Sequence, residues 1–166
     1  FSVSRGNTLL LILLFFQLFL GGVMSGMRAG IVAPTWPDIN GVYFPLELKF
    51  ITNNDLDFFG NYESNHMNGI IIQFFHRMTA YLIYALTWFL GFYHLKRENK
   101  SSAFNYFRIA GLLSIQLLLG IITVLQCVGS VPLLWAVLHQ IFGIICFLYV
   151  LLIFFKSGMK SEKVMV

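Results

Sequence analysis

The sequence has few charged residues, few cysteines and none of the common motifs of soluble enzymes. Of its 166 residues, 11% are charged and two are cysteines, whereas 58% are hydrophobic. A soluble core of this size cannot bury so much apolar surface, which excludes an ordinary soluble domain. A phosphate-binding glycine loop, a nucleophile triad, zinc-ligand spacing and a nucleic-acid motif are all absent. The composition therefore indicates an integral membrane protein.

Four apolar stretches are long enough to cross a bilayer, for which about 20 residues are needed. They span about residues 9–27, 70–95, 107–126 and 133–155. We interpret the first as a membrane span and not a signal peptide, because it lacks a short apolar region that ends at a clear cleavage site. The sequence predicts an all-α membrane protein in which residues 1–166 form one bundle of four transmembrane helices.

The basic residues predict the orientation of these spans, because positively charged loops stay on the cytoplasmic side. Eight of them fall on one side of the membrane: Arg5, Lys96, Arg97, Lys100, Arg108, Lys156, Lys160 and Lys163. Only Arg28, Lys49 and Arg77 fall on the other. We expect a multi-pass protein of the inner (plasma) membrane with both termini in the cytoplasm. The net charge of +4 is explained by this topology, so we expect no nucleic-acid partner.

The two predicted outer connections differ in length. Residues 28–69 hold five acidic side chains, three prolines and many aromatic side chains, and we expect them to form a structured cap. The other outer connection, around residues 129–131, is very short, which predicts that the last two spans are tight antiparallel neighbours.

Short motifs repeat between the first and second pairs of spans. QLFLG at residues 17–21 matches QLLLG at 116–120, and HRMTA at 76–80 matches HQIFG at 139–143. The two matched members run in the same direction across the membrane, so the pairs would be related by a pseudo-two-fold axis along the membrane normal. Chance matches between apolar helices are the alternative.

Two histidines lie at the same predicted depth. His76 and His139 are each about seven residues, or roughly 10 Å, inside the outer end of a span. Haem iron takes axial histidines from opposite faces of the ring, and helix bundles build such sites from facing helices. We therefore predict that the pair binds haem iron; a hydrogen-bonded pair that serves packing is the alternative. His94 lies about 27 Å deeper, which predicts an interfacial position, and His66 in the outer cap is a second-rank candidate.

Arg77 follows His76, and Arg28 ends the first span at the outer side. Each could pair bidentately with a haem propionate, although both could instead reach lipid headgroups. Gln73 and Gln140 flank the histidines and could orient them. The two cysteines, Cys127 and Cys146, differ too much in depth for a disulfide, so we interpret both as small apolar fillers.

Four segments together resemble one known family. They are GGVMSGMRAGIVAPTWPDINGVYFP (21–45), NGIIIQFFHRMTAY (68–81), QLLLGIITVL (116–125) and VPLLWAVLHQ (131–140). These segments look like the C-terminal half of haem A synthase, a membrane enzyme of cytochrome oxidase biogenesis.

The resemblance implies two homologous four-helix bundles, an oxidoreductase that oxidises a methyl group of haem O to the formyl group of haem A, and a b-type haem held by His76 and His139. It also implies an electron donor and an enzyme that supplies haem O, and it leaves a homo-oligomer open. The N-terminal half, with its own histidine pair and a glutamate thought to act in catalysis, is missing from this chain, so its catalytic residues stay unknown.

Two other readings are open at this point. A stand-alone four-helix b-type cytochrome would move electrons and synthesise nothing. A haem-free transporter or channel subunit would show no Soret absorption after purification.

Overall fold

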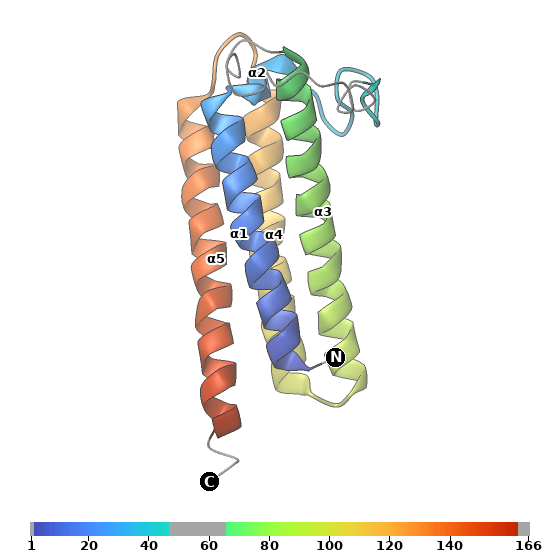
Figure 1. The fold of residues 1–166 in the computed structure, drawn as a ribbon, viewed down its shortest axis with the longest axis vertical. Coiled ribbons are helices and arrows are strands. Elements are labelled where there is room, and N and C mark those ends of the chain that lie inside the picture. Colours follow the sequence, from blue (N-terminus) through green and yellow to red (C-terminus); the bar gives the residue numbers. More distant parts are fainter. Residues whose placement is uncertain (1, 47–65, 163–166) are drawn as a thin grey trace, which may run out of the picture. The chain divides into compact units, whose positions relative to one another are not determined.

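The computed structural model describes residues 2–46 and 66–162, and most of these residues are helical (Figure 1). Four long helices are α1 (Val3–Gly26), α3 (His66–Lys96), α4 (Lys100–Leu125) and α5 (Leu133–Glu162). A short helix, α2 (Ala29–Val32), follows α1. Extended structure in the described residues is limited to one isolated bridge between Ile39 and Val42. The predicted all-α fold is confirmed.

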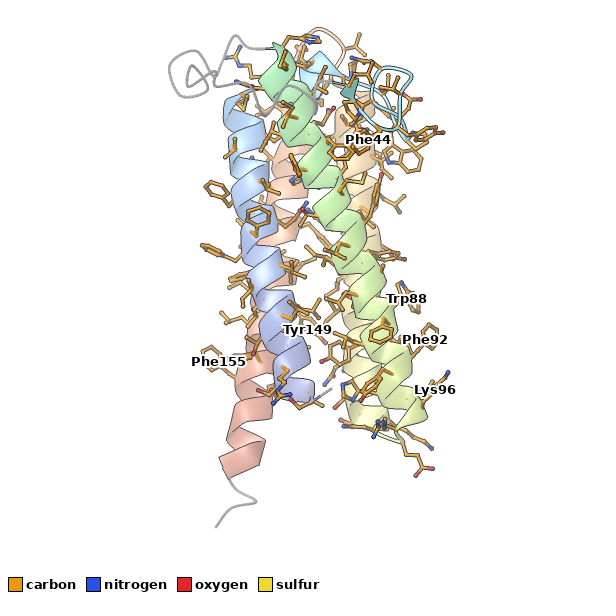
Figure 2. All side chains as sticks on the ribbon, turned by 45° about the vertical axis from the view of Figure 1, so that its right-hand side comes forward. Phe44, Trp88, Phe92, Lys96, Tyr149 and Phe155 are labelled. Carbon is orange, nitrogen blue, oxygen red and sulfur yellow. The ribbon has the colours of Figure 1, made fainter. Side chains whose placement is uncertain are left out.

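All four long helices are long and apolar enough to cross a membrane. Many of their large side chains are exposed, including Phe15 (67%) on α1 and Leu133 (75%) on α5. Figure 2 labels two further examples, Phe92 on α3 and Phe155 on α5, whose rings point away from their helices. In water such surfaces would be costly, whereas in a bilayer lipid covers them. The prediction of a multi-pass membrane protein is confirmed.

Three of the long helices begin before the predicted apolar stretches, and α5 continues to Glu162, past the predicted end of its stretch at residue 155. α1 begins at Val3 and α4 at Lys100, several residues before the hydropathy of the sequence rises. Polar residues near the ends continue the helical hydrogen bonds, so hydropathy marks only the part of a helix that crosses the lipid. Asn99 accepts a hydrogen bond from the amide of Ser102 at 3.2 Å and caps α4, as Asn commonly does.

The contacts divide the chain into two compact units, and each unit contains a stretch of every long helix. The first unit comprises residues 1–18, 79–117 and 141–166, and the second comprises residues 19–78 and 118–140. One apolar cluster fills the first unit, with Leu10, Ile83, Ile109 and Val150 among its buried members. Two smaller clusters fill the second unit, around Leu20 and Ile72 and around Ala33 and Phe74.

The predicted outer cap is described up to residue 46. There the chain turns back on itself through Asn40 and Gly41, both of which have positive φ. The ring of Phe44, labelled in Figure 2, packs edge-on against Phe74 of α3 with the ring centres 5.4 Å apart. Most of the acidic residues of the predicted cap (Glu47, Asp55, Asp57 and Glu63) lie outside the described residues.

Candidate functional site

The two histidines that the sequence singled out lie together in the second unit. His76 of α3 and His139 of α5 have ring centres 6.4 Å apart, with the ring planes at 71°. Both side chains are partly buried. The imidazoles thus come from two different helices, as the motif repeat predicted for equivalent positions.

A glycine lies against each of these imidazoles. A Cβ atom added to Gly21 of α1 would lie 3.2 Å from Cε1 of His76, and one added to Gly120 of α4 would lie 2.8 Å from Cε1 of His139. These glycines end the repeated motifs QLFLG and QLLLG. The sequence shows that both copies of the motif end in glycine. The contact of each glycine with a histidine was not predicted. The same glycine-to-histidine contact therefore occurs in both helix pairs.

Gln73 and Arg77, on either side of His76, bind the chain that follows α1. Gln73 donates from Nε2 to the carbonyl oxygens of Ala33 (3.1 Å) and Ala29 (3.5 Å). Arg77 donates from Nη1 to the carbonyl of Asp38 (2.8 Å), and from Nη2 to those of Thr35 (2.7 Å) and Ala33 (3.5 Å). Both side chains are buried. The sequence predicted neither set of carbonyl contacts, because the acceptors are backbone atoms of α2 and of the loop that follows it.

The loop that accepts these bonds is held by its own hydrogen bonds. The Thr35 hydroxyl donates to the Asp38 carbonyl at 3.0 Å and accepts from the amide of Asn40 at 2.8 Å. The carboxylate of Asp38 accepts from the amide of Gly41 at 2.9 Å. This backbone hydrogen bond, followed by that from the Thr35 hydroxyl, holds the pKa of the Asp38 carboxyl below its ordinary value.

The other predicted candidates lie farther out on the surface. Arg28 is exposed at the turn between α1 and α2, with φ of 49°. His66 is exposed at the first position of α3. Gln140, next to His139, is also exposed, and it donates to the hydroxyl of Ser25 on α1 at 3.2 Å. The hydrogen bond of Gln140 connects α5 to α1.

His94, for which the sequence predicted an interfacial position, belongs to the first unit and is buried within the protein. It is 4% exposed and stacks on the ring of Tyr106, with ring centres 5.4 Å apart and planes at 11°. The neighbouring Lys96 and Arg97 are exposed.

Cys127 and Cys146 are free thiols and both are buried, as expected for apolar fillers. The sulfur of Cys127 packs against Gly30 of α2, where an added Cβ would come within 2.7 Å of it. Burial raises the pKa of the Cys127 thiol, so this side chain stays protonated at neutral pH.

A two-histidine donor set fits haem better than a bare metal ion. No group of three or more His, Cys, Asp or Glu side chains that could hold a metal occurs among the described residues. A porphyrin brings four nitrogen ligands of its own, so two axial imidazoles complete its iron. The imidazoles of His76 and His139, with ring centres 6.4 Å apart, are the side chains that would hold such an iron.

Comparison with known proteins decides the family. The model of the COX15-CtaA family, described as cytochrome oxidase assembly protein, matches residues 2–151. The chain belongs to this family. Several curated proteins with similar sequences are named haem A synthase. Those from Pelagibacter ubique and Rhodopseudomonas palustris are 32% identical over 146 residues and 35% identical over 136 residues. No solved structure matches the chain.

The family members named here are much longer than this chain. The matches cover 88% and 82% of this chain, but only 40% and 35% of the Pelagibacter and Rhodopseudomonas relatives. A third relative, from a Bradyrhizobium species, is 34% identical over 76% of this chain and 33% of its own length. Membership of a cytochrome oxidase assembly family confirms the predicted resemblance, and it favours that reading over a stand-alone cytochrome or a transporter subunit.

Proposed function

We propose that this chain is the haem-binding C-terminal half of a haem A synthase, with a b-type haem held between His76 and His139. The single observation that carries the proposal is the pair of imidazoles from two helices, 6.4 Å apart, each lying against a glycine. The relatives are named haem A synthase, and the reaction that the resemblance implies is oxidation of a methyl group of haem O to the formyl group of haem A. When bound, the haem would supply one-electron chemistry.

The roles of the protein side chains follow from their positions. His76 and His139 would hold the haem iron. Arg28, exposed at the turn between α1 and α2, would attract a propionate. Arg77 is buried within α3 and donates to backbone carbonyls, and it would add its positive charge on the same side. Gln73 would act through its neighbours, since its amide is bound to backbone carbonyls. Catalysis by the complete enzyme would also need the second bundle, an electron donor and an enzyme that supplies haem O.

The location and orientation of the chain are part of the same proposal. The distribution of basic residues supports an orientation with both termini in the cytoplasm and the histidine pair toward the outer face of the inner membrane. A haem near that face would lie where its propionates reach water. A homo-oligomer is compatible with this arrangement.

Replacement of the histidines tests the proposal. We expect the purified chain to bind haem with a low-spin, six-coordinate spectrum, and His76→Ala or His139→Ala to convert it to high spin or to abolish binding, because each removes one axial ligand. His66→Gln is the matched control, since His66 is exposed at the start of α3. A low-spin spectrum that persists in both alanine variants would rule out the proposed ligands.

A further inference from the structure

Two side chains close to His76 connect α3 to the segment of residues 29–38. Gln73 lies one turn before His76, and Arg77 follows it directly. Together they donate hydrogen bonds to four different backbone carbonyls, those of Ala29, Ala33, Thr35 and Asp38. The Ala33 carbonyl receives a bond from each of them. Both ends of this turn of α3 are therefore fastened to the same stretch of backbone.

The orientations of the two side chains are well determined by their partners. Only the NH₂ end of a glutamine can face two carbonyl oxygens, so the amide of Gln73 cannot be turned around. The guanidinium of Arg77 is a permanent cation that is only 8% exposed, and a buried cation needs compensating dipoles. Three carbonyl oxygens provide them. Both side chains are thus held in one conformation on either side of the imidazole.

The segment that they bind is itself stiff. The amide of Asn40 is bound by the Thr35 hydroxyl, and the Asn40 side chain donates to the Val32 carbonyl at 3.1 Å. Val32 in turn packs against Gly69 of α3, where an added Cβ would lie 2.9 Å from it. Because the segment has internal bonds and a second contact with α3, it can act as a rigid support for the outer turns of this helix.

We propose that Gln73 and Arg77 are positioning residues: by fastening residues 29–38 to α3, they hold the His76 imidazole at its distance from His139. The significance of that position for haem rests on the proposed function above. Arg77 acts in this role through the geometry of its planar fork, which reaches three carbonyls at once, and a lysine cannot reproduce that geometry.

Amide hydrogen exchange in the haem-free protein tests whether Gln73 and Arg77 hold residues 29–38 against α3. Arg77→Lys keeps the charge but loses the fork, and Gln73→Met removes the donor at nearly constant shape. We expect both variants to speed exchange at the amides of Asn40 and Gly41 on the order of tenfold, which corresponds to about 1.4 kcal/mol. Arg108→Gln, which removes an exposed charge on α4, is the control and should leave those rates unchanged. Unchanged rates in both test variants would overturn the proposal.

The position of the ring needs a separate measurement. We expect Arg77→Lys and Gln73→Met to shift the Cε1 NMR signal of His76 in the haem-free protein, and to alter the low-spin EPR signature of the haem-loaded protein. Faster exchange together with an unmoved His76 signal would mean that the contacts stabilise the loop only, and the positioning role would be wrong. The NMR measurement does not need haem, so a chain that fails to bind haem would contradict the proposed function and still test this inference.

Discussion

The second unit contains two versions of one arrangement, and they differ in what surrounds the histidine. In the pair α1/α3, Gly21 lies against His76; in the pair α4/α5, Gly120 lies against His139. Beyond this shared contact the pairs diverge. His76 has buried neighbours, Gln73 and Arg77, that bind a loop, whereas the neighbour of His139 is the exposed Gln140.

The connections between the helices explain this difference. α1 and α3 are joined by a long segment whose first part offers its carbonyls to side chains of α3. α4 and α5 are joined only by residues 126–132, in which Gly129 has φ of 73° and Pro132 precedes the first turn of α5. Such a short turn has few backbone groups to offer. A repeated helix pair can thus keep one contact, glycine against histidine, while one copy alone gains a supporting loop.

The largest effect should come from closing the space at the two glycines. In Gly120→Ala the new Cβ would lie 2.8 Å from His139, a distance that forces the ring to move, so we expect haem affinity to fall by about 1–3 kcal/mol, the usual cost of overpacking. Gly21→Ala, at 3.2 Å from His76, should cost less. Haem titration followed by the Soret band measures both.

Gly22→Ala is the matched control for these variants, because nothing lies within 4 Å of a Cβ at that position. If Gly22→Ala lowers haem affinity as much as Gly120→Ala does, the loss is a general result of replacing glycine by alanine in a helix. It would then not come from the contact with histidine.

A smaller effect should separate the two glutamines. Gln73→Met removes the two bonds of a fully buried amide, so we expect the free energy of unfolding in detergent to fall by about 1 kcal/mol. Gln140→Met removes one bond of an exposed side chain and should change it by less than about 0.5 kcal/mol. Thermal unfolding of the two haem-free variants measures these changes. Equal losses of unfolding free energy in Gln73→Met and Gln140→Met would contradict the proposed difference between the helix pairs.

The smallest effect concerns pH and only the loop beside α3. The pKa of Asp38 is lowered in the folded protein, chiefly by the backbone amide of Gly41. The hydrogen bond from the Gly41 amide to the Asp38 carboxylate is therefore fully present above the pKa of Asp38 in the unfolded chain, about 3.9. It is lost as the pH falls through the lower pKa of the folded protein. We expect the NMR signal of the Gly41 amide to shift with pH below about 4, and to lose that shift in Asp38→Asn.

The other connection provides the control for this titration. Residues 126–132, QCVGSVP, contain no carboxylate, so the amide of Gly129 should show no acid transition of its own. If the Gly41 amide signal still shifts with pH in Asp38→Asn, the titrating group is not Asp38.

The sequence by itself determined the fold class and the histidine pair. Apolar stretches of membrane length predict helices because backbone groups in lipid must be bonded within the helix. The equal predicted depth of His76 and His139 on two such helices indicated that they form a pair. The repeated QL-x-LG motifs contain the two glycines that lie against these histidines. These features are periodic along the chain, so they can be read without knowing which helices pack together.

Only the tertiary structure decided what Gln73, Arg77 and His94 touch. The partners of Gln73 and Arg77 are backbone carbonyls about 40 residues away along the chain, and every residue except the chain terminus has such a carbonyl, so the sequence gives no sign of which one will be used. His94 lies beside exposed charges in the sequence, but the helix turns its ring onto Tyr106 and buries it. The direction of a side chain from its helix depends on packing between helices, and packing is a property of the folded chain.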